Sequence, residues 1–311
     1  MSIVERTVGV RRISVRGRLP ERPGFLGALM VSPAVLYLLG LVGFPLVLSF
    51  VYAFSDVTTG NPNVHLVGLS TFAAAVRDPV FAVALRNSFI FTFFSQALVI
   101  VLSTILAFGL SADFPGKWVV RFLILLPWTT PVALGAVAWL WMLDSIFSPF
   151  DWVLSAVGLI HHGAHIPFLG QARLAMGSIV VLQAWRMLPL ATVILMAGLT
   201  SIPQDIQDAA AVDGAGFWGR LIHVTLPLLQ PIMLVALLFG IVFTFTDIAV
   251  IFVLTGGGPD NSTQVLASWA FYKGINGGNL AQGAATALFM FPVLLGLAVL
   301  LLRIASRVEV T

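Results

Sequence analysis

The chain has 311 residues, of which 59% are hydrophobic and only 9% are charged, with a formal net charge of +3. A water-soluble globular domain carries about 25% charged residues, so this composition excludes that class and indicates a membrane protein. The absence of cysteine excludes disulfides and thiolate metal sites. The basic residues form no patch interleaved with aromatic residues, so we expect no nucleic-acid partner.

The pattern of apolar residues predicts six membrane-spanning helices. A hydrocarbon core of about 30 Å takes about 20 helical residues per crossing. Apolar stretches of this length run over residues 26–53, 88–112, 119–142, 176–198, 231–254 and 282–302. They lack the alternation of apolar and polar residues that is typical of barrel strands. The sequence therefore predicts an all-α, polytopic integral membrane protein with six transmembrane helices.

The first element is a basic tail over residues 1–24. Its six arginines are Arg6, Arg11, Arg12, Arg16, Arg18 and Arg22. Basic residues collect on the cytoplasmic side of short loops. With the tail inside, five further basic residues are inside, at Lys117, Arg121, Arg220, Arg303 and Arg307, and four are outside, at Arg77, Arg86, Arg173 and Lys273. We therefore expect both termini in the cytoplasm, a membrane domain over 25–303 and a short C-terminal tail over 304–311.

A cleaved secretory signal is the alternative for the N-terminal region. The apolar run from Phe25 to Phe54 is much longer than the roughly 7–15 residues of a signal core, and it has no clear small-residue cleavage site. We expect it to be the first span and to contact the lipid bilayer.

The second and third connections carry no reactive constellation. The only Gly-Lys pair, Gly116–Lys117, lacks the glycine spacing of a phosphate-binding loop, so we do not expect this chain to bind ATP. His161 and His165 have the spacing of helical metal ligands, but Gly163 interrupts the segment and we expect no carboxylate nearby. A solvated outer loop, with no metal, is the prediction here.

Two charged residues lie deep inside predicted spans, Arg186 in the fourth and Asp247 in the fifth. A charge at the bilayer centre costs about 2.5–3.5 kcal/mol on insertion scales, so both should face protein or water. Their depths differ by roughly 6 Å at about 1.5 Å per residue, which a guanidinium can bridge. We expect them to pair across the two helices or to flank a polar solute path. A packing salt bridge without solute contact is the alternative.

Other polar or aromatic residues are weaker candidates for this path. They are Gln96, Gln183, Thr244, Thr246, Trp128, Trp139, Trp141 and Trp185. Tryptophans near span ends are common interface anchors, and we favour that role for them.

Between the fourth and fifth spans, residues 208–227 read DAAAVDGAGFWGRLIHVTLP. Pro203 suits a first helical position, and Gly214 can end that helix in the left-handed conformation. Phe217 and Trp218 begin a second short, apolar helix that we expect to end at Pro227. A turn of small residues beside aromatic anchors suits a protein partner, and a helix pair lying on lipid headgroups is the alternative.

The spacing in this stretch resembles the cytoplasmic motif E-A-A-x3-G-x9-I-x-L-P of binding-protein-dependent ABC importer permeases. The matching positions are Asp208, Ala209, Ala210, Gly214, Val224, Leu226 and Pro227, with Asp in place of Glu and Val in place of Ile. Stretches such as ILLPWTTPVALGAVAWLWML and AWRMLPLATVILMAGLTSIP resemble carbohydrate-type members, and the likeness covers roughly residues 30 to 300. The run TGGGP is similar to the larger membrane subunit of the maltose importer.

The resemblance implies a type I ABC importer permease for a sugar or related polyol-type solute, in a bacterial or archaeal plasma membrane. The coupling loop 200–229 would dock on an ATPase subunit through residues 203–227. The residues implied in coupling are Asp208, Ala209, Ala210, Asp213, Gly214, Ala215, Phe217, Trp218, Leu226 and Pro227. The residues implied at the outer mouth, with an ordinary turn as the alternative, are Thr255, Gly256, Gly257, Gly258 and Pro259.

The same resemblance implies several partners. They are a second permease chain, two ATPase subunits and an extracytoplasmic solute-binding protein, which would dock on the outer loops 55–87, 143–175 and 255–281. ATP and Mg²⁺ are expected in the ATPase, and no cofactor is expected in this chain.

Two other classes of function are the alternatives. An ion-coupled secondary transporter would need inverted repeats and broken helices at the midplane, and the six spans show no obvious internal symmetry. A non-transporting scaffold or a membrane enzyme is the second alternative, and an enzyme would need a reactive constellation.

Overall fold

The computed structural model describes the backbone of residues 23–308 and the side chains of residues 26–306. The six arginines of the predicted basic tail therefore lie outside the described residues, as do residues 309–311. The chain divides into two compact units, residues 1–49 and residues 50–311.

The first unit contains most of one apolar helical run, whose last residues, 50–53, belong to the second unit. α1 (Pro23–Leu38), the π-helical turn η2 (Leu39–Gly43) and α2 (Phe44–Ala53) follow one another without a break. Residues Leu26–Ala53 are long and apolar enough to cross a membrane, and the most apolar stretch has no buried side chain. A helix that is apolar on every side suits lipid rather than water. The predicted first span therefore corresponds to one helical run.

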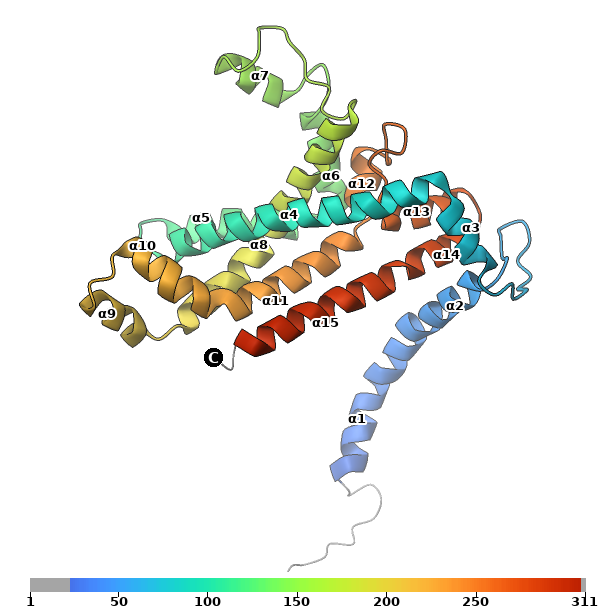
Figure 1. Cartoon of the computed structure of the whole chain (residues 1–311), viewed down its shortest axis with the longest axis horizontal. Helices are drawn as coiled ribbons and strands as arrows, with labels where there is room; N and C mark the ends of the chain where they lie inside the picture. Colours follow the sequence, from blue (N-terminus) through green and yellow to red (C-terminus); the bar gives the residue numbers. More distant parts are fainter. Residues whose placement is uncertain (1–22, 309–311) are drawn as a thin grey trace, which may run out of the picture. The chain divides into compact units, whose positions relative to one another are not determined.

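The second unit holds the remaining helices (Figure 1). The first six are α3 (Ser70–Arg77), α4 (Pro79–Ser111), α5 (Lys117–Thr129), α6 (Val132–Met142), α7 (Pro149–Ala156) and α8 (Ala172–Ser201). Next come α9 (Gln204–Val212), α10 (Phe217–Arg220), η3 (Leu221–Thr225), α11 (Leu226–Phe245) and α12 (Ala249–Leu254). The last are α13 (Leu266–Phe271), η4 (Tyr272–Asn276), α14 (Leu280–Leu288) and α15 (Met290–Val308). Within residues 23–308 no strand forms, which confirms the all-α prediction.

Five helical runs among the described residues are long and apolar enough to span a membrane, and a bent pair makes six if it counts as one span. The predicted second, fourth and sixth spans lie in α4, α8 and α14–α15. α4 begins at residue 79 rather than 88, because Pro79 occupies the first turn and the Asp78 carboxylate accepts the Val80 N–H at 2.9 Å. α15 continues to Val308, so the predicted tail 304–311 begins as helix.

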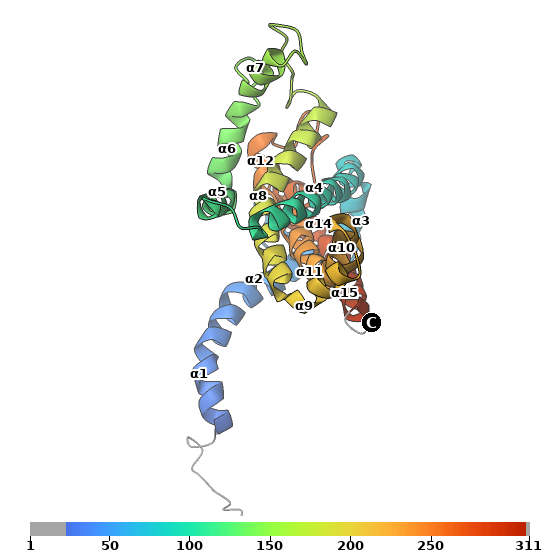
Figure 2. The ribbon, with the colours of Figure 1, turned by 90° about the vertical axis from the view of Figure 1, so that its left-hand side faces the viewer.

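The predicted third span is not one straight helix. α5 and α6 meet at an angle of 98°, which is visible in Figure 2. The break lies at Thr130 and Pro131, both of which have extended ψ angles, 133° and 126°. A residue before proline is forced out of the helical region by the proline ring, so the helix ends there.

The predicted fifth span, 231–254, is wrong at both ends. One continuous helical run extends from Phe217 to Phe245, and the chain then breaks before α12. Pro227 does not end the helix, because the preceding π-turn η3, with Leu226 N–H bonded to the Leu221 carbonyl, widens the helix where the proline ring enters. After α11, the Asp247 carboxylate accepts the Val250 N–H at 3.0 Å and starts α12 afresh.

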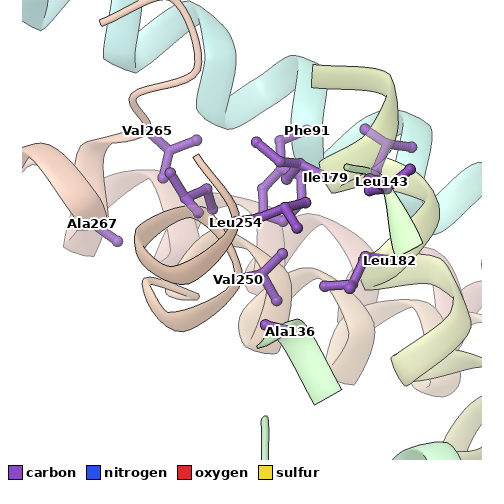
Figure 3. Packing of buried hydrophobic residues seen from close by; sticks show 11 residues of the cluster. Phe91, Ala136, Leu143, Ile179, Leu182, Val250, Leu254, Val265 and Ala267 are labelled. Atoms are coloured by element: carbon purple, nitrogen blue, oxygen red, sulfur yellow. The ribbon is translucent and has the colours of Figure 1, made fainter. Parts of the chain in front are cut away.

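The core of the second unit is formed where α4, α8, α11 and α12 pack together. α11 contacts both α4 and α15 and lies between them in Figure 1. Phe91, Ile179, Leu182 and Val250 belong to one buried cluster, which also includes Ala136 from α6 (Figure 3). The packing of α6 against α12 thus holds the outer half of the bent pair in place.

Candidate functional site

Five polar side chains, four from three helices and one from the break after α11, meet inside the bundle. Thr244 Oγ1 accepts two amide hydrogens, from Gln96 Nε2 at 2.8 Å and from Gln183 Nε2 at 3.0 Å. On α8, Arg186 Nη2 donates to Gln183 Oε1 at 3.1 Å and also forms an ion pair with Asp247. We call these five residues the polar cluster. It joins α4, α8 and α11 to the helix break.

The polar cluster is almost completely inaccessible in this chain. Gln183 and Thr244 have no exposed surface, and the side chains of Arg186 and Asp247 are 13% and 7% exposed. Buried charges are tolerated only when they are paired and hydrogen-bonded, and Asp247 meets both conditions through Arg186 and the Val250 N–H. The structure thus brings the predicted pair together and favours the packing salt bridge over direct contact of this pair with solute.

Thr246 does not join the polar cluster. Its hydroxyl donates to the Val242 carbonyl of its own helix at 2.8 Å, and the residue is exposed. Of the six charged or polar residues named as candidates for the path, five therefore meet in the polar cluster and Thr246 alone is exposed at the break.

A cavity of about 450 Å³ lies between α4, α11 and α15, next to the polar cluster. Its wall is mainly apolar, with Phe93, Ile241 and Leu297 among the lining residues. Two lining residues contribute buried oxygen atoms without a hydrogen-bond partner in the described structure, Oε1 of Gln96 and Oγ1 of Thr92.

The predicted coupling segment forms a helical hairpin at the end of α8. α9 starts one residue after Pro203, so this proline precedes the helix instead of occupying its first position. α9 ends at Val212, and Gly214 takes a left-handed φ of 81°, in open space where an added Cβ would meet no atom within 4 Å. The Ala215 N–H then bonds to the Ala210 carbonyl at 3.0 Å. The turn is closed by backbone bonds, as expected for a helix ended by glycine.

The tip of this hairpin exposes apolar side chains. Phe217 and Trp218 are 61% and 69% exposed, and their rings contact each other edge to face with centroids 5.3 Å apart. Val212, which the sequence analysis did not single out, is 88% exposed at the end of α9. Exposed apolar residues clustered on a protein are typical of interaction sites.

The base of the hairpin is tied by one side-chain hydrogen bond and contains the rest of the motif. Gln207 Nε2 donates to Thr225 Oγ1 at 3.1 Å, which links α9 to η3. The remaining predicted coupling residues differ in exposure. Asp208, Ala209, Asp213 and Pro227 are exposed, and Ala210, Ala215 and Leu226 are half-buried.

The Thr255–Pro259 run is a tightly bonded turn rather than an open loop. Gly256 and Gly257 take left-handed φ angles of 60° and 91°. Thr263 Oγ1 bonds to Thr255 Oγ1 at 2.8 Å and donates to the Gly258 carbonyl at 2.7 Å. A Cβ on Gly257 would overlap the amide of Gln264, so this position requires glycine.

The chain after this turn is anchored on α4. Asn87 Nδ2 donates to the carbonyls of Ser262 and Gln264 at 2.6 and 3.1 Å, and Ser88 Oγ accepts the Leu266 N–H at 2.9 Å. α13 follows and its first five residues are buried. The predicted outer loop 255–281 therefore contains a packed element, which sequence alone did not indicate because the contacts with α4 are about 175 residues apart in the chain.

In the segment after α6, the expectation that no carboxylate lies near the histidines is wrong. Asp151 Oδ2 lies 3.6 Å from His165 Nδ1, so a carboxylate does lie beside this loop. Asp151 is 5% exposed and its Oδ2 also accepts the Ile166 N–H at 3.1 Å. Within the described residues no group of three potential metal ligands forms. The contact between Asp151 and His165 instead holds the loop against α7. Trp152, on the same helix, is 73% exposed.

Comparison with known proteins adds three findings. The sequence model described as "Binding-protein-dependent transport system inner membrane component" matches residues 99–310. The trehalose/maltose transport system permease protein MalF of Thermococcus litoralis is 30% identical over 291 residues, covering 94% of this chain and 97% of that protein. The diacetylchitobiose uptake system permease protein DasB of Streptomyces coelicolor is 29% identical over 302 residues, covering 94% and 91%.

The solved structures give the same fold. The chain superposes on a bacterial ABC transporter involved in the import of the acidic polysaccharide alginate, with a TM-score of 0.78 and 19% identity. The alignment covers 93% of this chain and 97% of that chain. At this identity the likeness concerns the fold.

Proposed function

Because this chain belongs to the family of binding-protein-dependent transport system inner membrane components, we propose that it forms half of the translocation path for a sugar or related polyol-type solute. It is the membrane-spanning permease subunit of an ATP-driven ABC importer. The carbohydrate class is supported by the relatives named for trehalose, maltose and diacetylchitobiose. The distribution of basic residues supports cytoplasmic placement of both termini and of the α9–α10 hairpin.

The observation that carries the coupling role is the continuous helix from Phe217 to Phe245. Its first turn bears the exposed aromatic pair, and its last turn bears Thr244 of the polar cluster. At about 1.5 Å per residue the 29 residues measure roughly 43 Å, enough to cross the bilayer. An ATPase subunit that grips Phe217 and Trp218 would therefore move one rigid element that ends beside the path.

The complete importer then needs further chains. We assign ATP and Mg²⁺ to two ATPase subunits, and the other half of the path to a second, related permease chain. A solute-binding protein would dock on the outer loops, where Trp152 and Phe147 are 73% and 75% exposed beside α7.

Photocrosslinking in the assembled importer tests the coupling role. A benzophenone amino acid at Val212, which is 88% exposed, is expected to capture the ATPase subunit. The same probe at Val157, which is 64% exposed after α7, is the matched control and is expected to capture none. Capture at both positions or at neither would contradict the assignment.

A second experiment tests the path. We propose that the polar cluster holds the break in place and that Thr246, exposed at the break, borders the solute path. The chain contains no cysteine, so Thr246→Cys and Thr244→Cys each introduce a single thiol. In the assembled importer a water-soluble thiol reagent should modify position 246, with protection by transported solute, and should spare the buried position 244. Equal modification of both, or no protection, argues against this path.

A secondary transporter is the alternative that the test must exclude, because one span is a bent helix pair, broken at Thr130–Pro131. Proteoliposomes holding the importer separate the two. Uptake that requires ATP inside and the binding protein outside supports the proposal. Uptake driven by an ion gradient without ATP would overturn it.

A further inference from the structure

A cavity of about 320 Å³ lies at the base of the α9–α10 hairpin, and the exposed tip residues Val212 and Trp218 do not line it. It is enclosed by the last turn of α4, the end of α8, the start of α9 and the turns α10 and η3. The residues that matter for the argument are Phe108, Ser111, Leu199, Arg220 and Leu221. The solute path proposed above does not use this cavity, and of the two aromatic residues proposed to contact the ATPase only Phe217 lines it.

The position of the cavity along the membrane normal follows from helix length. α4 has 33 residues and α8 has 30, so at about 1.5 Å per residue they measure roughly 50 and 45 Å. A hydrocarbon core is about 30 Å thick and the headgroup regions bring the bilayer to about 40–45 Å. Both helices are longer than the hydrocarbon core, and we infer that their last turns, at Ser111 and Ser201, lie in the cytoplasmic headgroup layer together with the cavity.

The cavity contains one cation without an anionic partner. Arg220 lines the wall and is half-buried, and no carboxylate of the described residues lies within 4 Å of its guanidinium. No acidic residue lines the cavity. The neighbouring amides of Gln204 and Gln207 donate to Asp208 and Thr225, both at 3.1 Å, so Arg220 supplies the charge of the site.

The rest of the wall combines the polar side chains of Ser111, Gln204, Gln207 and Thr225 with an apolar part, and the apolar part suits a ligand that carries hydrocarbon next to its charge. Phe108, Leu199 and Leu221 face the same space from three different elements. A guanidinium forms paired hydrogen bonds with phosphate, and the cytoplasmic leaflet carries anionic lipids. We propose that the cavity binds the phosphate of an anionic glycerophospholipid at Arg220, with the glycerol and upper acyl carbons against the apolar wall.

Native mass spectrometry of the purified importer, with phosphatidylglycerol, phosphatidylcholine and inorganic phosphate as probes, tests the proposal. Arg220→Gln is expected to lower phosphatidylglycerol occupancy by about fivefold or more, the effect of one basic residue at a membrane surface. Arg303→Gln is the matched control, because Arg303 is exposed on α15 and lies outside this cavity. It should leave occupancy unchanged.

A second variant keeps the test informative if Arg220→Gln does not fold. Ser111→Glu places a carboxylate on the opposing wall, where it can neutralise Arg220 from within, and the same loss of phosphatidylglycerol is expected. Conversely, Arg220→Lys keeps the charge and should retain much of the occupancy.

Several outcomes would overturn the proposal. Equal losses of phosphatidylglycerol occupancy in Arg220→Gln and Arg303→Gln would mean that binding depends on general surface charge and not on this cavity. Displacement of phosphatidylglycerol by inorganic phosphate would identify a free anion as the ligand, and equal binding of phosphatidylcholine would exclude selection by charge. If Arg220→Gln released the ATPase and left lipid occupancy unchanged, the ligand would be an acidic side chain of that partner. None of these outcomes bears on whether the importer transports a sugar.

Discussion

Replacing Thr244 with valine tests whether the polar cluster holds the bundle together. Valine has nearly the same shape but lacks the hydroxyl, so the amides of Gln96 and Gln183 would each lose an acceptor. Hydrogen bonds between membrane helices contribute about 0.6 kcal/mol on average and up to about 1.7 kcal/mol each, because the unfolded chain in the membrane also finds partners. With two bonds lost, we expect the free energy of unfolding to fall by about 1–3 kcal/mol.

The assay is reversible unfolding in mixed micelles, in which the fraction of sodium dodecyl sulfate is raised and helix content is followed by circular dichroism. Thr246→Val is the control, since its hydroxyl bonds only to the Val242 carbonyl of its own helix. We expect that change to stay within about 0.5 kcal/mol, as for other exposed substitutions. A double-mutant cycle with Gln183→Leu should show coupling to Thr244 and none to Thr246.

Two results would refute this reasoning. The first is equal destabilisation by Thr244→Val and Thr246→Val. The second is a cycle without coupling between Thr244 and Gln183, which would mean that the distances of 2.8 and 3.0 Å do not correspond to stabilising bonds.

Two further predictions follow from the same kind of local geometry. Gly240→Ala should destabilise the chain by about 1–3 kcal/mol in the micelle assay, because the added Cβ would overlap Oε1 of the buried Gln96. Gly177→Ala is the control and should be neutral or stabilising, because the space around Gly177 is open. Equal effects of the two substitutions would contradict this reasoning. The N–H groups of Phe147 and Ile146 lower the pKa of Asp144 below its ordinary value of 3.8, so the loop after α6 should keep these bonds at neutral pH and lose them only as the pH falls through that lowered pKa. With the protein in a nanodisc, the NMR chemical shift of the Phe147 backbone amide nitrogen should therefore change with pH, with a midpoint below pH 3.8. A midpoint at or above pH 3.8 would contradict the assignment.

The sequence predicted those features whose cause is local. Long apolar stretches can satisfy their backbone hydrogen bonds in a membrane only as helices, so the first, second, fourth and sixth spans were each predicted within a single helical run, although α4 begins earlier than predicted. The left-handed turn at Gly214 was predicted as well, since glycine adopts that conformation without strain. Both inferences needed no knowledge of the neighbouring elements.

Two breaks had local signals that hydropathy alone concealed. Thr130 precedes Pro131, which ends α5, and Asp247 is a carboxylate able to bond a backbone N–H inside an apolar run. Judged by hydropathy alone, each stretch is one continuous apolar span, because the residues on either side of each break are apolar. A rule that ends helices before proline and at a lone acidic residue would have divided both.

The meeting of Gln96, Gln183 and Thr244 could not be predicted in this way. Gln96 and Thr244 are 148 residues apart, and Gln183 and Thr244 are 61 apart. Which polar side chains share an acceptor depends on how α4, α8 and α11 rotate about their axes. That rotation is set by packing of apolar side chains elsewhere, including Phe91 and Leu182, rather than by any motif near the polar residues.

The wrong prediction at Pro227 has the greatest consequence for function. Had the helix ended there, a push on Trp218 would have reached the membrane through a flexible joint. Instead the helix runs without a break from Phe217 to Phe245, although the π-turn η3 loosens its hydrogen-bond ladder and Pro231 removes one bond from it. A helix transmits displacement along its axis until its ladder stops, and here it stops next to the polar cluster, where Asp247 starts a new helix. This continuity supports coupling in which the coupling hairpin and the helix break move as the two ends of one element.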